Sequence, residues 1–456
     1  MSTYDVLIRD GALCTEAETR VADVAISDGR IVAIGADLGG SAKNEILATG
    51  LHVFPGVIDA HVHFNEPGRT EWEGFASGTR ALAAGGTTTA IEMPLNAHPP
   101  TIDPAAFDLK VAAARASALV DFALWGGLTP GSLDQMEELD ARGIVGFKAF
   151  MSSSGIEDFS AVDDLTLYEG MAVAARLGRI VAVHAENDAI TRELASNARR
   201  EGRTRIRDYL TSRPAIAEIE AISRAILFAE ETCCPLHIVH VSTGRGVALV
   251  AEAAQHGVDV TCETCPHYLA LTDEDVERLG AVAKCAPPLR SEAEREALWQ
   301  QLLTGNVAFI ASDHSPAPPE MKTDSDFFAV WGGISGCQTL LGIVLTEGWE
   351  RRDLSLQQIV RLTSVNVARR FGFPDKGRLV IGADADLALV DLNSSDTLRA
   401  SDLLYRHQHS PFVGQMLRGR VVRTMVRGIT VFLEGAIVSA PVGRLIQPTS
   451  GGSSQK

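Results

Sequence analysis

The sequence predicts an α/β protein built around a (β/α)8 (TIM) barrel, with a small discontinuous β-sandwich domain formed by both chain ends. Eight apolar runs typical of strands alternate with helical patterns over about 320 residues, which suits a barrel of parallel strands with insertions. The two ends of the chain instead show short apolar runs separated by turn signals. Polar residues also recur at the ends of the central runs, where barrels of this kind carry their chemistry.

The chain ends are expected to form one small domain together, over residues 1–53 and 376–449. The first part reads YDVLIRDG, VADVAISDG and RIVAIG, and Asp28-Gly29 between two of these apolar runs indicates a hairpin. The same pattern returns after Lys376, in RLVIGADADLALVDL and GRVVRTMVRG. Residues 450–456 are rich in Gly and Ser and are expected to be a flexible tail.

The predicted barrel spans residues 54–375. A strong helical pattern lies at SRPAIAEIEAISRAILFAEE, with Ser212 as the expected cap and Pro214 in the first turn. A doubly wound open sheet is the alternative, but no G-x-G-x-x-G follows the first strand. The eight barrel strands are expected within residues 53–64, 85–94, 120–128, 144–151, 179–186, 235–242, 258–269 and 306–316.

Composition argues against several classes of partner. The chain carries 41 Lys and Arg against 58 Asp and Glu, and this formal charge of −17 disfavours nucleic acid and anionic membranes. The N-terminus lacks a basic segment followed by an apolar one, and no apolar run reaches the ~18 residues of a membrane span. Seven cysteines in so long a chain are typical of reduced thiols. We therefore expect a cytoplasmic protein.

Metal-binding residue types recur at the ends of five predicted strands. His61 and His63 stand at i and i+2 of the first strand, so both imidazoles point to one face, and such a buried pair needs a polar partner. Each residue alone has an ordinary explanation, such as a core histidine, an ion-paired lysine or a helix-capping aspartate. Their recurrence favours a metal centre, formed by His61, His63, Lys148, His184, His240 and Asp313.

The expected ligands divide into two groups. His61, His63 and Asp313 would hold one divalent ion, and His184 and His240 would hold a second. Imidazole and carboxylate ligands suit Zn²⁺, and also Co²⁺, Mn²⁺ or Fe²⁺.

A protonated lysine beside two cations would be repelled, so Lys148 is expected in another chemical form. Burial and neighbouring cations lower the pKa of a lysine. The neutral amine can react with carbon dioxide to give a carbamate, which is a carboxylate on a long stem. We therefore expect Lys148 as N6-carboxylysine, bridging both ions.

The His-x-His after the first strand, the lysine, the two later histidines and the final aspartate resemble the metal set of the binuclear amidohydrolases. More narrowly, the chain is similar to the cyclic amidohydrolases, which comprise hydantoinases (dihydropyrimidinases), dihydroorotases and allantoinases. The resemblance covers nearly the whole chain, including the β domain from both ends. It implies a homo-oligomer, tetramer or dimer, that acts on a small cyclic amide with Asp313 as general base and acid.

Two positions bear on which cyclic amide is the substrate. Dihydroorotases typically have arginine where this chain has Asn65, and that arginine grips a ring carboxylate. Hydantoinases usually have tyrosine five residues after the bridging lysine, where this chain has Ser153. The remaining motifs are similar to those of allantoinases, in the order NEPGRTEWEGF, EMPLN, GFKAFMSSSG, ETCPHYL, KCAPPLR, SDHSP and WGGISG.

The resemblance therefore implies hydrolysis of the cyclic ureide allantoin to allantoate, a step of purine (ureide) catabolism. A water bridging the two ions would lose a proton and attack a ring carbonyl, and Asp313 would pass that proton to the departing nitrogen. The glycines of WGGISG suit either close approach to the substrate or an ordinary loop turn. Substrate contacts are expected from Ser153, Asn65, Asn96, Gly332 and Gly333.

Other activities are weighed against this one. Within the family, hydantoinase is the first alternative and dihydroorotase the second. A Schiff-base lyase that uses Lys148 without metal would leave four strand-end histidines unexplained. A non-enzymatic scaffold is disfavoured, because all six metal-binding positions carry suitable side chains.

Overall fold

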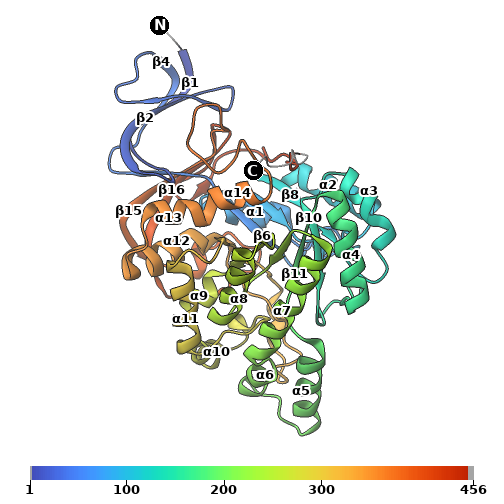
Figure 1. Cartoon of the computed structure of the whole chain (residues 1–456). Helices are drawn as coiled ribbons and strands as arrows, with labels where there is room; N and C mark the ends of the chain where they lie inside the picture. The colour runs from blue at the N-terminus through green and yellow to red at the C-terminus, as the bar shows by residue number, and fades with distance from the viewer. Residues whose placement is uncertain (1–2, 450–456) are drawn as a thin grey trace.

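The computed structural model describes residues 3–449, and the tail expected over 450–456 lies outside the described residues. Parallel strands at the centre are surrounded by helices, and a separate sheet from both chain ends lies at one end of the molecule (Figure 1). The central strands are β6 (Val57–Val62), β7 (Thr87–Glu92), β8 (Asp121–Leu124), β9 (Gly126–Gly127), β10 (Gly146–Phe150), β11 (Ile180–His184), β12 (Leu236–Ile238), β13 (Val260–Thr264) and β14 (Phe309–Ile310).

The central strands follow one another around a ring in sequence order. β6, β7 and β8 form one parallel sheet, and β9 to β14 form another. At one seam β8 and β9 are consecutive parts of one chain segment, and Val145 N donates to Leu124 O at 2.9 Å. At the other seam Val62 bridges His314 in parallel register, and His63 N donates to His314 O at 2.8 Å. The barrel-type α/β fold predicted from the sequence is confirmed.

Helices connect successive strands and pack their apolar faces on the ring. No helix among residues 3–449 is both long and apolar enough to cross a membrane. The helices are α1 (Phe75–Ala84), α2 (Pro104–Ser117), α3 (Met136–Ala141), α4 (Asp164–Leu177), α5 (Asp188–Arg200), α6 (Ile206–Ser212), α7 (Ala215–Thr232), α8 (Gly244–Gln255), α9 (Pro266–Ala270), α10 (Asp273–Leu279), α11 (Glu292–Leu303), α12 (Leu340–Ile343), α13 (Leu356–Val360) and α14 (Asn366–Arg370).

Two of the element boundaries that differ from the prediction are explained by proline. The expected cap Ser212 is the last residue of α6, and α7 begins at Ala215 after Pro214, because a proline disfavours helical backbone at the residue before it. The run expected as a strand over 258–269 ends at Thr264. Pro266 then begins α9, where its missing N–H is tolerated in a first turn.

The terminal sheet contains nine strands in one hydrogen-bonded sheet, ordered β18-β17-β16-β15-β5-β1-β2-β3 with β4 beside β1. The hairpin expected at Asp28-Gly29 is confirmed, since both residues have positive φ and Ser27 pairs with Arg30. The strands of the terminal sheet are β1 (Thr3–Cys14), β2 (Thr19–Ser27), β3 (Arg30–Gly35), β4 (Ser41–Leu47), β5 (His52–Pro55), β15 (Leu387–Thr397), β16 (Met416–Val426), β17 (Ile429–Leu433) and β18 (Ala436–Ile437).

Both chain ends share one apolar core in this sheet. Ile8 and Val24 from the first part lie in the same buried cluster as Leu389 and Met425 from the last part. The chain then returns to the barrel, where Ile446 N donates to Phe122 O at 2.8 Å. All seven cysteines are free thiols.

A buried charge cluster joins the barrel to the terminal sheet. Lys376 Nζ lies 2.5 Å from Asp121 Oδ2, 2.7 Å from Asp386 Oδ2 and 3.0 Å from Asp384 Oδ2. Burial alone would lower the pKa of Lys376, but the three carboxylates raise it. Asp121 also binds the guanidinium of Arg427. This cluster joins Asp121, the first residue of β8, to Asp386, the residue directly before β15.

Replacing Lys376 by methionine is expected to destabilise the whole protein. The substitution leaves the buried carboxylate of Asp386 without a cation, which costs about 3–5 kcal/mol in the free energy of unfolding. Urea unfolding measures the change. Lys43→Met is the control, because its ion pair with Asp5 is exposed and should contribute little. Equal stability of the two variants would contradict a structural role for the cluster.

Candidate active site

The six predicted ligand positions all lie at the carboxyl ends of barrel strands. His61 belongs to β6, Lys148 to β10 and His184 ends β11. His240 follows β12 by two residues, and Asp313 follows β14 by three. Every one of these side chains is buried. The ring of parallel strands therefore brings together residues that are up to 252 positions apart, from His61 to Asp313.

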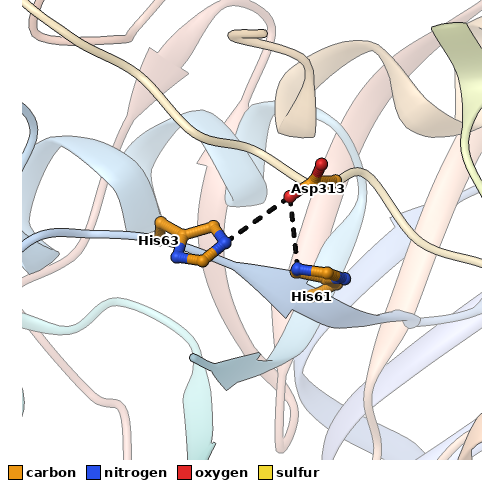
Figure 2. Close-up of side chains that lie close together, drawn as sticks. All are labelled: His61, His63 and Asp313. Atoms are coloured by element: carbon orange, nitrogen blue, oxygen red, sulfur yellow. Dashed lines mark ion pairs between the residues drawn. The ribbon is translucent and has the colours of Figure 1, made fainter. Parts of the chain in front are cut away.

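The first group is His61, His63 and Asp313 (Figure 2). The Oδ1 atom of Asp313 lies 3.2 Å from Nε2 of His61 and 3.5 Å from Nε2 of His63. The three ligand atoms lie within 4.8 Å of one another. One imidazole comes from the strand and the other from the residue just after it, and both face the same carboxylate.

Glu263 determines which nitrogen of His61 is free. An ionised carboxylate only accepts hydrogen bonds, so His61 Nδ1–H donates to Glu263 Oε1 at 2.6 Å. Burial would raise the pKa of Glu263, but the adjacent imidazoles of His61 and His237, which donate hydrogen bonds to it, lower it to about 2. The Nε2 lone pair of His61 is then directed toward the Asp313 carboxylate. Two acceptors at 3.2 Å repel each other unless a proton or a metal cation lies between them.

The second group is His184 and His240, whose Nδ1 and Nε2 atoms lie 3.1 Å apart. His184 Nε2–H donates to Glu186 at 2.9 Å, and Glu186 is in turn paired with Arg213. The Nδ1 lone pair of His184 therefore faces His240. The rings of His240 and His61 are 5.4 Å apart between centroids, so the two groups adjoin.

Lys148 lies among these groups without a partner of its own. Its side chain is 0% exposed, and Nζ has no hydrogen-bond partner among residues 3–449. Burial lowers its pKa to about 7, against the opposing charges of Asp313 and Glu263. Nζ lies 4.8 Å from the centre of the Phe150 ring, which stacks on His184. An unpaired buried amine is costly, so this position favours the neutral form.

The same burial shifts the imidazoles toward their neutral forms. Burial lowers the pKa of His63 to about 4 and that of His240 well below its usual value. Neutral imidazole is the form that coordinates metal. For Asp313, burial alone would raise the pKa, but the adjacent imidazoles of His61 and His63 lower it.

Left-handed backbone recurs at the site. His240 and Asp313 have φ of 41° and 45°, and Asn65 and Asn96 have φ of 63° and 68°. This region is uncommon for residues with a side chain and is strained for His and Asp. The left-handed conformation changes the direction of the chain just after a strand, at residues whose side chains belong to the candidate site.

A cavity of about 840 Å³ is bounded by His61, His63, His184, His240 and Asp313. Three of the expected substrate contacts, Ser153, Asn96 and Gly332, also line it. Asn65 and Gly333 are not among the lining residues. Asn65 is fully buried and donates from Nδ2 to Pro316 O at 3.4 Å. A Cβ on Gly333 would lie 2.2 Å from Ser315 O, so this glycine permits a close approach of two chain segments.

Several residues that support the site were not identified from the sequence. Glu263 and Glu186 fix the orientation of His61 and His184, and such outer partners tune ligand affinity. His237 also donates to Glu263, at 3.2 Å. A charged residue inside an apolar strand, as in ETCPHYL, was the available signal for Glu263.

The chain belongs to the Amidohydrolase family, whose sequence profile matches residues 52–431. A protein of Rubrobacter xylanophilus named allantoinase is 63% identical over 448 residues, which cover 98% of each chain. A Deinococcus radiodurans protein named allantoinase is 52% identical over 449 residues, covering 98% of this chain and 100% of its own. The solved structure of an Arthrobacter aurescens L-hydantoinase (dihydropyrimidinase) matches with a TM-score of 0.95 at 37% identity, covering 97% of this chain and 100% of that one. The family resemblance noted in the sequence is confirmed.

Replacing Glu263 by glutamine should weaken metal binding without removing any ligand. Glutamine can donate as well as accept, so the orientation and tautomer of His61 are no longer enforced. Metal affinity is expected to fall about 10–100-fold, as chelator competition would measure. Glu231→Gln, on the exposed face of α7, is the control. Unchanged affinity in Glu263→Gln would contradict the role assigned to this carboxylate.

Proposed function

We propose that this protein hydrolyses the ring of allantoin to allantoate, as a binuclear metal-dependent enzyme with Asp313 as general base and acid. The observation that supports the metal-dependent part is the convergence of ligand atoms from His61, His63 and Asp313 within 4.8 Å of one another, where a metal cation would fit between the imidazoles and the carboxylate. The observation that favours allantoin is the identity of 63% and 52% to two proteins named allantoinase.

The donor atoms fit a pair of divalent ions. His61, His63 and Asp313 would hold one ion, and His184 and His240 the other. Imidazole and carboxylate donors favour Zn²⁺, with Co²⁺, Mn²⁺ and Fe²⁺ as alternatives.

Lys148 would bridge the two ions as a carbamate formed with carbon dioxide. Its buried and unpaired Nζ supports this assignment, because a carbamate would give that position the partners it lacks. The carboxylated form also replaces a cation by an anion between two metal sites, which removes the repulsion that a protonated lysine would feel.

When bound, the metal pair supplies activated water and polarises the ring carbonyl. Asp313 takes the proton that this water loses and delivers it to the ring nitrogen as the C–N bond breaks. The oxygen of water and one hydrogen enter the new carboxylic acid, which releases its proton to solvent, and the other hydrogen completes the NH2 of the ureido group. The lowered pKa of Asp313 keeps its carboxyl group ionised, and the ionised form is the one that can accept a proton. Ser153, Asn96 and Gly332 offer neutral polar groups around the ring.

Hydantoin hydrolysis is the second candidate, because the L-hydantoinase structure matches almost the whole chain at 37% identity. Ser153 stands where hydantoinases usually carry tyrosine, and this favours allantoin instead. A cytoplasmic location is proposed from the cysteine usage of the chain, and a dimer or tetramer is proposed from the family resemblance.

Ring opening of allantoin, hydantoin, dihydrouracil and dihydroorotate by the metal-loaded protein tests the substrate assignment. We expect kcat/KM for allantoin to exceed the others by about tenfold or more, because the ureido arm meets polar groups that the smaller rings leave unpaired. The metal-free protein is the control for background ring opening. A preference for hydantoin or dihydrouracil would refute the allantoin assignment and retain the metal-dependent class.

Lys148→Ala is expected to lose bound metal and activity, since it removes the group proposed to bridge the ions. Elemental analysis measures the metal, and short carboxylic acids are expected to restore part of the activity by filling the bridging position. Asp313→Asn is the matched comparison: its turnover should fall by about 10²–10⁴, with no gain from added acid. Full metal content in Lys148→Ala would contradict the bridge.

A further inference from the structure

The segment from Phe327 to Gly333 forms one wall of the cavity. Five of its residues line the cavity, and it contains neither helix nor strand. An irregular segment must obtain its shape from side-chain contacts, because it lacks a ladder of backbone hydrogen bonds. The lining residues of this wall are Phe328, Ala329, Val330, Trp331 and Gly332.

Lys284 holds the first half of this wall. Its Nζ donates to Phe327 O at 2.6 Å, to Phe328 O at 3.2 Å and also to Val330 O. All three donors of an ammonium group are thereby used. The same Nζ lies 4.5 Å from the centre of the Tyr209 ring.

Lys322 holds the second half of the wall. Its Nζ donates to Trp331 O at 2.9 Å and to Gly333 O at 2.7 Å. A third bond at 3.2 Å reaches Ala281 O, in the short 3-10 turn that precedes Lys284. Two lysines therefore bind five carbonyl groups of a seven-residue segment and link it to the turn around residues 280–284.

This use of lysine is costly. Lys284 is buried and Lys322 is partly buried. Lysines in such positions usually pair with a carboxylate, but within the described residues neither has one within 4.0 Å. Burial lowers the pKa of both lysines to about 7. Apolar side chains could fill this space without the free-energy cost of placing charged amines there without a carboxylate. The use of two lysines beside the cavity therefore indicates that the shape of the wall serves the function of the protein.

We propose that Lys284 and Lys322 are positioning residues that hold the 327–333 wall for substrate binding and thereby set substrate affinity, while leaving the chemical step to the strand-end residues. The identity of the substrate rests on the proposed function. None of the six residues of the candidate metal centre bonds to either lysine. Loss of a lysine should therefore loosen the wall and spare the ligands.

The test replaces each lysine by methionine, which has similar length and no donor. We expect KM to rise about tenfold or more, kcat to stay within about threefold, and metal content to be unchanged. Amide hydrogen exchange should become faster in residues 327–333, which is a readout independent of activity. Lys43→Met, an exposed lysine of β4, is the control for loss of one charge.

The outcomes separate this proposal from the proposed function. Each variant is compared with the wild type on whichever cyclic amide the wild type hydrolyses best, so failure with allantoin itself bears only on the substrate. An unchanged KM, or a fall in kcat with loss of metal, would overturn the positioning role. If Lys284→Met does not fold, Lys284→Gln, which keeps part of the donor set, takes its place and should still raise KM above the wild-type value.

Discussion

The candidate site depends on the burial of ionisable groups where the parallel strands end. Lys148 and the imidazoles of His63 and His240 are buried, and burial lowers the pKa of each, which favours the neutral form. These are the forms that metal coordination and carbamate formation require. The barrel thus prepares the chemical state of the ligands by the same packing that brings them together.

Burial also requires that the ligand side chains be held in a defined orientation, because a buried polar group without a hydrogen-bond partner is costly in free energy. Glu263 and Glu186 answer this by holding one nitrogen of His61 and of His184, which directs the other nitrogen toward the centre. Arg213 balances the charge of Glu186. Lys284 and Lys322 hold the backbone of the cavity wall in a similar way. Their amines donate to carbonyl groups, whereas the site histidines donate to carboxylates.

Stability and chemistry occupy different ends of the barrel. Lys376 and its carboxylates lie where β8 begins and the terminal sheet attaches, whereas the candidate ligands lie where the strands end. Each end therefore has its own buried charges. At the base every carboxylate of the cluster has a cationic side chain beside it, whereas at the site the carboxylate of Asp313 lies beside the imidazoles of His61 and His63.

The sequence by itself determined the alternation of strands and helices and the position of the six site residues at strand ends, because apolar periodicity and polar interruptions are local signals. Local patterns were weaker at Ser212 and at 265–269, where prolines moved the element boundaries. Only the tertiary structure decided that Glu263 holds His61, that Lys284 and Lys322 bind the cavity wall, and that Asn65 is outside the cavity lining. These contacts join residues far apart in the chain, such as the 202 positions between His61 and Glu263, and no local pattern specifies such partners.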